Sequence, residues 1–342
     1  MQHFPLISVI IVTWNSKQYL PACLDKLSSQ IFRDFEVILV DNGSEDAGIL
    51  DLREIRPKFN LYIERLETNL GFAVANNIGA RLARGKWIAL LNTDAFPDPD
   101  WLEQLLLAAE QNMEYTAFSS RQIQYNASHL LDGTGDSYHV CGMAWRNEMG
   151  YPAKNHGQKA KEIFSPCAAA AMYLREAFLE VGGFDENFFS YYEDVDLGFR
   201  LRLAGYRSLY VPKAVVHHVG SATFGVRSDF AFYHYHRNMI WTYTANMPSP
   251  YFGVYLPQHI LANLIYVIYY ALLGRGKVLV KAKWDALREL PRVWKRRKEI
   301  QAKRKVMPDA VVEFMEKGLL QPYRLGYRLR RVLKKYGEGA EK

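Results

Sequence analysis

The sequence predicts an α/β fold with a mostly parallel central sheet, followed by a helical C-terminal extension. Two runs rich in β-branched residues, 6–13 and 35–40, are typical of strands buried on both faces. Between them, residues 19–29 place apolar side chains at helical spacing. This order predicts a βαβ unit, whose ligands bind at the carboxyl ends of the strands. With 342 residues, 49% of them hydrophobic and 23% charged, the composition is that of a folded protein.

The same alternation continues along the chain. Residues 61–65 and 87–91 predict a third and a fourth strand. A glycine-containing turn at 69–71 leads into a helix that runs to about residue 83. Asp98 and Pro99 then predict the start of another helix, with Asp98 as its cap.

The middle of the chain gives a weaker pattern. Residues 115–165 show no clear period and predict only loosely defined strands and loops. Residues 166–173 are small and apolar, which indicates either a tightly packed strand or a place where a ligand approaches the backbone. A helix at 175–181 and a strand at 208–211 follow, and the segment 215–220 comes after them.

An acidic stretch at residues 188–200 places Glu193, Asp194 and Asp196 among aromatic residues. It predicts the start of a short helix that ends at Gly205. Acidic residues at a helix start can simply cap it and interact with the helix dipole. Alternatively, one carboxylate among apolar rings and other charges is tuned as a general base.

Polar side chains follow the predicted strands where each one ends. Thr13, Asn15, Asp41 and Asn42 lie at two such ends, and these ends meet at one edge of a parallel sheet. Asp41 could accept a hydrogen bond from a nucleobase or a ribose hydroxyl. These residues therefore indicate a nucleotide pocket.

A metal site is predicted beside this pocket. Asp94, after the fourth strand, offers the oxygen ligands that hard cations prefer. His217 or His218 could complete the metal shell, because imidazole also binds Mn²⁺. The competing interpretation is a structural histidine in a strand.

Several classes of protein are disfavoured. A G-x-G-x-x-G motif does not follow the first strand, and the chain has no G-x-x-x-x-G-K-[ST] motif, which argues against a nicotinamide-binding domain and a P-loop NTPase. Cys23, Cys141 and Cys167 are far apart, as expected for a reducing compartment rather than for a disulfide framework. The N-terminus lacks the features of a signal peptide, so we expect a cytoplasmic catalytic part.

The C-terminal extension, residues 241–342, is predicted to be helical and basic. Residues 255–273 are apolar apart from a few polar positions, and residues 275–305 carry thirteen Lys or Arg against three acidic residues. This pattern is typical of an anchor at an anionic membrane surface. The alternative is a packed helical pair with a solvated basic face. Nucleic-acid binding could also explain the basic charge, but we do not expect it.

Five segments resemble, in this order, the motifs of glycosyltransferase family 2. They are Ser8–Asn15, Val40–Ser44, Asn69–Gly79, Leu91–Asp94 and Tyr192–Asp196. The resemblance covers about residues 6–240 and is strongest to the rhamnosyltransferase-like branch, which builds bacterial cell-surface polysaccharides. It implies an inverting enzyme with the GT-A fold, a single Rossmann-like sandwich formed by a catalytic domain at residues 1–240.

The resemblance also implies a role for each matching residue. Asp194 would be the base that deprotonates the acceptor hydroxyl, with Glu193 placing acceptor or donor. Asp94 would bind Mg²⁺ or Mn²⁺, with His218 or His217 facing the metal. The D-x-D motif of the family is here Asn92-Thr93-Asp94, so one metal carboxylate is replaced by an amide. The nucleotide-sugar would contact Thr13, Asn15, Asp41, Asn42, Asn69, Gly71, Asn77, Asn92 and Thr93.

The expected function is transfer of a sugar from a nucleotide-diphosphate donor to a hydroxyl group. By resemblance the sugar is rhamnose from dTDP-rhamnose, although UDP-sugars remain open. The acceptor would be a saccharide or a lipid-linked saccharide, and the enzyme would work in the cytoplasm, on the inner face of the cell membrane. The alternatives are a non-catalytic nucleotide-sugar-binding scaffold at the membrane and a nucleotidyltransferase. The latter would need a basic phosphate-binding loop early in the chain.

Overall fold

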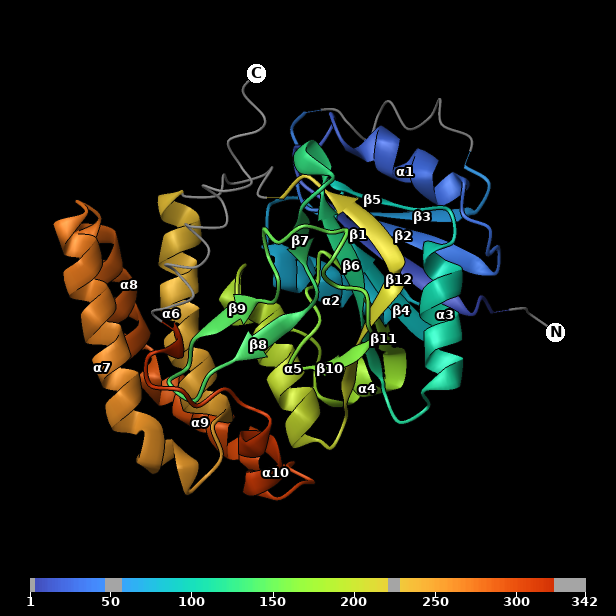
Figure 1. Ribbon diagram of the computed structural model, residues 1–342. Helices are drawn as coiled ribbons and strands as arrows, with labels where there is room; N and C mark the ends of the chain where they lie inside the picture. The colour runs from blue at the N-terminus through green and yellow to red at the C-terminus, as the bar shows by residue number, and fades with distance from the viewer. Residues whose placement is uncertain (1–3, 47–56, 221–227, 323–342) are drawn as a thin grey trace.

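The computed structural model describes residues 4–46, 57–220 and 228–322, and its centre is a ten-stranded mixed sheet (Figure 1). Its main path has the order β10-β12-β6-β11-β4-β1-β2-β3. The predicted strands lie side by side in parallel in the second half of this path. They are β1 (Ile7–Thr13), β2 (Phe35–Asp41), β3 (Asn60–Arg65) and β4 (Trp87–Leu91).

The other half of the sheet contains the strands that the sequence predicted only loosely. β11 (Ala170–Leu174) pairs antiparallel with both β4 and β6 (Ala117–Gln124), so β6 runs in the same direction as β4. β12 (Ser208–His218) is parallel to β6. Shorter strands complete the structure: β5 (Ala95–Pro97), β7 (Leu131–Gly133), β10 (Lys161–Ile163), and a separate ribbon of β8 (Asp136–Tyr138) and β9 (Ala144–Arg146).

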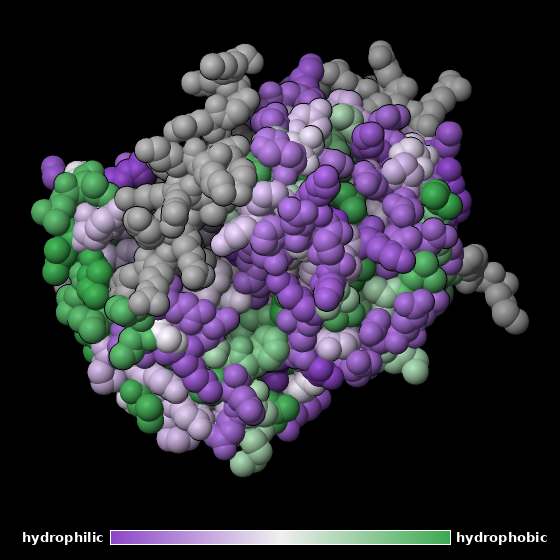
Figure 2. Space-filling model, viewed as in Figure 1, coloured by the Kyte–Doolittle hydropathy of each residue, from purple (hydrophilic) through white to green (hydrophobic). Residues whose placement is uncertain are grey.

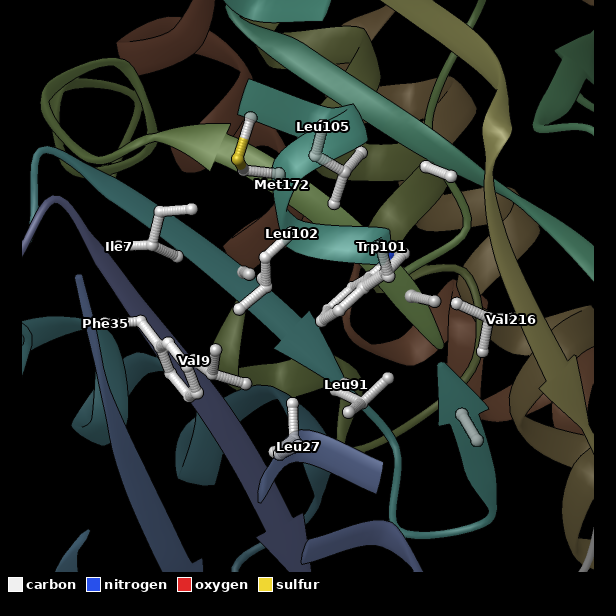
Figure 3. Packing of buried hydrophobic residues seen from close by; sticks show 14 of the residues in the cluster. Ile7, Val9, Leu27, Phe35, Leu91, Trp101, Leu102, Leu105, Met172 and Val216 are labelled. Carbon is white, nitrogen blue, oxygen red and sulfur yellow. The ribbon is translucent and has the colours of Figure 1, made fainter. Parts of the chain in front are cut away.

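Helices cover both faces of the sheet because alternate strand residues point to opposite sides. α1 (Leu20–Ser28) and α3 (Trp101–Gln111) pack on one face, where Ile7, Val9 and Trp101 belong to one buried cluster (Figure 3). Ile10 and Ile38 face the other side, toward α2 (Phe72–Leu82), α4 (Arg175–Glu180) and α5 (Glu193–Leu203). The result is the predicted α/β sandwich with a mostly parallel sheet.

Two predicted boundaries are wrong. The helix expected to start at Asp98 begins at Trp101. The Asp98 backbone N–H is still bonded to the Val215 carbonyl of β12 at 3.0 Å, just after β5 ends at Pro97, and a turn at 99–100 separates it from the helix. The strand expected at 208–211 continues to His218 as β12, whose register with β6 shifts between Val211 and Val215. Local sequence shows neither pairing, since both depend on partners far away in the chain.

The predicted C-terminal helices pack against the sandwich. They are α6 (Asp229–Asn246), α7 (Tyr251–Leu272), α8 (Gly276–Arg288), α9 (Leu290–Ala302) and α10 (Pro308–Glu313). α6 spans the expected boundary at residue 240. Its Met239 and Trp241 belong to one buried cluster with Phe199 of α5 and Val293 of α9. Residues 323–342, the end of the expected extension, lie outside the described part of the chain.

Candidate functional site

The strand ends converge on a cavity of about 620 Å³. β1, β2 and β4 are parallel, so their carboxyl ends share one edge of the sheet, and β12 ends at the same edge. β11 runs the other way and starts there, where the Ala169 carbonyl accepts a hydrogen bond from the Asn92 backbone at 2.9 Å. The predicted site residues that line the cavity are Asn42, Asn69, Asn92, Thr93, Asp94, Glu193, Asp194 and His218.

Two asparagines shape one wall of the cavity. The Asn42 side chain, just after β2, donates to Oδ1 of Asn69 at 2.8 Å and accepts from the backbone of Leu70 at 2.9 Å. Gly71 follows with a φ of 90°, and a Cβ there would lie 2.7 Å from the Phe189 ring and its carbonyl oxygen. A side chain at position 71 would therefore be strained and would displace the loop that precedes Asp194.

Thr13, Asn15 and Asp41 are not among the residues that line the cavity. Asp41 is fully buried, accepts from the Ser44 backbone at 3.0 Å and lies 3.2 Å from the Arg65 guanidinium. Asn15 accepts from the Glu45 backbone at 2.8 Å. These three residues thus hold the loop after β2, and their proposed contact with a nucleoside stays a prediction. Trp14 and Ser16, which the sequence did not single out, line the cavity instead.

Asn77 lies outside the cavity lining. Its amide accepts from the Phe184 backbone at 2.8 Å and donates to the Phe184 carbonyl at 2.9 Å. Asn77 is thus placed to fix the turn that leads into the acidic stretch, and this geometry does not bring it to a nucleotide.

The loop before Asp194 has an uncommon backbone. Phe189, Tyr191 and Tyr192 have φ angles of 66°, 67° and 73°, a left-handed region that bulky residues rarely adopt. Asn238 of α6 holds this loop: its amide donates to the carbonyls of Phe188, Ser190 and Tyr191 at 3.2, 3.0 and 2.7 Å. A strained loop held by many contacts is typical of a functional site.

Asp194 lies in the first turn of α5 and lines the cavity. One carboxylate oxygen accepts from the Ala168 backbone at 3.2 Å and the other from the Val195 backbone at 2.8 Å. Burial raises the pKa of Asp194, and burial together with the charge of Asp194 raises the pKa of Glu193 well above its usual range. A carboxylate with a raised pKa is a stronger base, which suits the predicted role.

Asp196 has a structural environment. It is fully buried and accepts hydrogen bonds from Arg200 at 2.8 Å, Asn246 at 2.7 Å and Arg296 at 3.0 Å. Although burial opposes it, these partners lower the pKa of Asp196. Asp196 therefore ties α5 to α6 and α9 rather than capping the helix, and its oxygens are occupied by these partners.

His218 faces Asp94, and His217 does not. Neighbouring residues of β12 point to opposite sides, and β5 pairs with this strand end. Nε2 of His218 lies 3.4 Å from Oδ1 of Asp94, whereas Nε2 of His217 lies 3.4 Å from Oδ1 of Asp98. His217 also does not line the cavity. The alternative between the two histidines is thus resolved in favour of His218.

A third carboxylate orients His218. Nδ1 of His218 lies 2.8 Å from Oδ2 of Asp132, which in turn accepts from Arg146 at 2.6 Å. Burial would lower the pKa of His218, but Asp132 and Asp94 raise it to about 9. Burial would raise the pKa of Asp132, but Arg146 and His218 lower it to about 2.

These residues fit a divalent cation. The buried Nε2 of His218 has no hydrogen-bond partner, and it faces the Asp94 carboxylate. A histidine whose other nitrogen is bound to a carboxylate is a common arrangement around protein metals. In the described residues, no group of three or more His, Cys, Asp or Glu side chains is placed to hold a metal. Asp94 and His218 are thus two candidate ligands, and a substrate diphosphate would have to supply others.

The sequence interpretation missed four polar residues of the cavity wall. They are Asp132, Asp136, Arg146 and Cys167, beside further polar lining residues such as Gln124 and Asn126. The first three come from residues 115–165, which showed no clear period, and Cys167 comes from the small apolar run at 166–173. The Arg146 guanidinium links Asp132 with Cys167: it donates to Oδ2 of Asp132 at 2.6 Å and lies 2.7 Å from Sγ of Cys167. The structure explains the glycine at position 133, because a Cβ there would lie 2.2 Å from the Arg146 side chain, but the sequence alone does not reveal this contact.

Comparison with known proteins identifies the family. The sequence model described as Glycosyl transferase family 2 matches residues 8–182, slightly more than half of the chain. The chain belongs to glycosyl transferase family 2. This confirms the resemblance drawn from the five sequence segments and, with it, the expectation of a glycosyltransferase.

Among curated relatives of this family-2 chain, an N-acetylglucosaminyl-diphospho-decaprenol L-rhamnosyltransferase of Mycobacterium tuberculosis is 30% identical over 64% of the chain and 78% of the relative. An uncharacterized protein of Sinorhizobium fredii is 28% identical over 66% of the chain, but the match covers only 26% of that protein. Two uncharacterized glycosyltransferases of Haemophilus influenzae are covered for 38% and 35% of their length. The chain therefore spans well under half of several relatives that it matches.

Solved structures show the same fold. S. aureus TarS 1–349 in complex with UDP-GlcNAc superposes with a TM-score of 0.58 at 18% identity, covering 94% of this chain and 92% of that one. The mannosyltransferase PcManGT from Pyrobaculum calidifontis, in complex with GDP-Man and Mn²⁺, gives a TM-score of 0.51 at 16% identity, with 91% and 87% covered. At these identities the likeness supports the GT-A fold alone.

Proposed function

We propose that this family-2 protein is an inverting glycosyltransferase that moves a sugar from a nucleotide-diphosphate donor to a saccharide hydroxyl. The observation that carries the proposal is the position of Asp194, a carboxylate with a raised pKa in the wall of the cavity that Asp94 and His218 also line. Neither a binding scaffold nor a nucleotidyltransferase requires a base in that position.

In this mechanism, the nucleotide lies along Trp14, Asn42 and Asn69. Asp194 accepts the proton of the acceptor hydroxyl while that oxygen attacks the anomeric carbon from the face opposite the leaving diphosphate, which inverts the configuration. Backbone donors from Ala168 and Val195 hold the Asp194 carboxylate in place without neutralising it. Asp94 and His218 would hold Mg²⁺ or Mn²⁺, which when bound supplies positive charge to the departing diphosphate.

We further propose rhamnose from dTDP-rhamnose as the donor sugar, with a lipid-linked saccharide as the acceptor. Support comes from the mycobacterial relative, whose name describes an L-rhamnosyltransferase acting on a diphospho-decaprenol. TarS and PcManGT, solved with UDP-GlcNAc and GDP-Man, keep other donors in consideration. A nucleotide-release assay across dTDP-, UDP- and GDP-sugars tests the transfer reaction and identifies the donor. Absence of release with every donor would contradict the proposal.

The proposed site of action is the inner face of the cell membrane, and helix α7 supports it. Its 22 residues include no Asp, Glu, Lys or Arg. It is the one described helix that is long and apolar enough to cross a membrane, and only 11% of its apolar window is buried. Figure 2 shows hydrophobic residues along the edge of the molecule where Figure 1 places α7. The exposed apolar residues of this α7 face are Val254, Ile260, Leu261, Leu264, Ile265, Ile268 and Leu272.

The inner side of α7 is fixed to the catalytic domain. His259 is buried, its Nδ1 lies 2.7 Å from the Cys141 carbonyl oxygen, and its ring stacks on Tyr243 at 4.0 Å. These contacts of His259 hold one side of α7 against the protein. We therefore propose that α7 lies in the membrane interface rather than across the bilayer.

The charge of the neighbouring helices favours an anionic membrane as the occupant of this face. α8 and α9 carry exposed Lys277, Arg288, Lys295 and Lys298, and cations beside an apolar helix are typical of proteins that bind anionic lipids. A second copy of the same face would bring like charges together. An anionic lipid surface satisfies both the apolar helix and the adjacent cations.

A further inference from the structure

The β8–β9 ribbon forms a wall of the cavity that is separate from the strand ends. Asp136 of β8 and Ala144, Trp145 and Arg146 of β9 line the cavity. Figure 1 shows the ribbon between α6 and the main sheet, on the side away from β2 and β3, where Asn42 lies. The ribbon is therefore placed to contact the acceptor rather than the nucleotide.

Asp136 has a carboxyl group with no assigned task. Its backbone N–H donates to the Ser165 carbonyl at 2.9 Å, and its own carbonyl accepts from Phe164 at 3.1 Å. The side chain is only 6% exposed, and it lines the cavity. Among the described residues, no hydrogen bond or ion pair involves its carboxyl group. A mostly buried carboxyl group that faces a cavity and has no protein partner is available to hydrogen-bond a ligand there.

One short segment ties Asp136 to Asp194. Ser165 pairs with Asp136 as an isolated β-bridge, and three residues later the Ala168 backbone donates to the Asp194 carboxylate at 3.2 Å. The two carboxyl groups therefore belong to one rigid part of the cavity wall. The two groups also interact electrostatically, because the negative charge of Asp194 helps to raise the pKa of Asp136.

Charged and ionisable groups from several elements surround Asp136, among them the Tyr173 hydroxyl of β11 and the Tyr235 hydroxyl of α6, whose pKa the charge of Asp136 helps to raise. Asp194 of α5 and Asp132 of β7 disfavour its ionisation, and Arg146 of β9 favours it. Arg146 is shared with Asp132 and with the Cys167 thiol, whose pKa burial raises. Burial and the charge of Asp194 together raise the pKa of Asp136 to about 8. Near neutral pH, Asp136 thus carries a proton, and it can donate a hydrogen bond while Asp194 accepts one.

Aromatic residues complete this side of the cavity. Trp145 of β9 and Tyr191, next to the acidic stretch, both line it and are half-buried. Aromatic rings beside paired carboxyl groups match the apolar face and the hydroxyl groups of a pyranose.

We infer that Asp136 is an acceptor-binding residue whose carboxyl group holds the hydroxyl adjacent to the one that Asp194 deprotonates, so that the acceptor is a sugar with a free vicinal diol. The inference rests on the proposed transfer reaction. One carboxyl group that donates and one that accepts match two neighbouring hydroxyls, whereas the ionised Asp194 would repel a phosphate acceptor.

The test compares the wild type with Asp136→Ala and Asp136→Asn, using the donor that the release assay identifies. The acceptor probes are methyl glycosides of rhamnose, glucose, galactose and N-acetylglucosamine, together with monodeoxy analogues of the one that is used. Asp25→Asn, an exposed substitution on α1, is the matched control. Thermal unfolding of each variant shows whether the fold is retained. Asp136→Asn keeps a hydrogen-bond donor and should retain the acceptor KM, so the loss is read only from Asp136→Ala or, if that variant unfolds, from Asp136→Val, which cannot form a hydrogen bond.

We expect Asp136→Ala to raise the acceptor KM by roughly tenfold or more, the usual effect of losing a hydrogen bond to a buried polar group, with the donor KM within about twofold of the wild type. The monodeoxy acceptor that lacks the adjacent hydroxyl should be used equally by the wild type and the variant. An unchanged acceptor KM in a folded variant, or a variant that still discriminates against that monodeoxy acceptor, would overturn the inference. If the wild type releases nucleotide from no donor, the proposed transferase itself fails.

Discussion

The side-chain amide of Asn238, on α6, donates to the backbone carbonyl of Tyr191 at 2.7 Å, three residues before Asp194. The same amide also reaches the carbonyls of Phe188 and Ser190. A helix that follows the family-matched region thus fixes the strained loop that presents the proposed base. This contact explains why α6 belongs to the catalytic unit.

Asn238→Ala should lower kcat without weakening donor binding. Loss of the amide frees the loop, and a displaced catalytic group costs roughly 10- to 100-fold in rate. Asn238→Asp should be worse, because it places a carboxylate against three carbonyl oxygens. Steady-state kinetics and donor titration check both variants. Equal kcat in the wild type and Asn238→Ala would show that the loop keeps its shape unaided.

His218→Ala should remove the effect of metal on nucleotide binding, and Asp132→Asn should weaken it by about 10- to 100-fold, as partners of metal ligands usually do. The physical reason is that Nε2 of His218 faces Asp94 while Asp132 fixes the ring. Calorimetric titration of UDP and dTDP with and without Mn²⁺ measures this.

His217→Ala is the matched control for this experiment, because His217 lies beside Asp98 rather than Asp94. It should bind metal and nucleotide as the wild type does. Equal losses in the two histidine variants would argue against the assignment of His218.

Asp136 should make stability depend on pH. Its pKa is about 8 in the folded protein and about 3.9 in an unfolded chain, so the folded state binds more protons between these values. Stability therefore falls as pH rises through this window. Asp136→Asn removes the effect, so its melting temperature should exceed that of the wild type by more at pH 8.5 than at pH 5.0, by a few degrees on the usual scale.

The control for the pH experiment is Asp25→Asn, whose exposed carboxylate should leave the pH dependence unchanged. A gain for Asp136→Asn that is the same at both pH values would mean that the Asp136 carboxyl group is ionised in the folded protein at pH 5.0.

Charges placed on the α7 face should abolish membrane binding. The variant Leu261→Glu/Leu264→Glu/Ile268→Glu changes three side chains that are 54–61% exposed, so the fold should persist. We expect the wild type to sediment with phosphatidylglycerol-containing vesicles and the variant to stay in solution. Met113→Glu, at an exposed apolar residue just after α3, is the control and should bind like the wild type.

Equal sedimentation of the triple variant would contradict the α7 proposal, as would wild-type retention on DNA without lipid binding. Truncation near residue 250 is a poorer test, because it would remove Val293 and Ala286 from the core that they share with α6.

The parallel half of the sheet and its strand ends could be predicted from the sequence because each strand is a local β-branched run. The positions of Asp94 and Asp194 in the cavity could also be predicted, because each residue lies in a short local motif. Asp132, Asp136 and Arg146 could not, because their place in the cavity depends on pairings between segments far apart, such as β6 with β7 and Asp136 with Ser165. The choice between His217 and His218 likewise depends on the pairing of β12 with β5.

The most direct test of the account is nucleotide release and sugar transfer by Asp194→Asn. The substitution keeps the shape of the side chain but removes the base, so transfer should fall by at least about 100-fold while donor affinity stays within about twofold of the wild type. This result would place the base at Asp194. Transfer at more than a tenth of the wild-type rate, in a variant that binds the donor normally, would contradict the central claim.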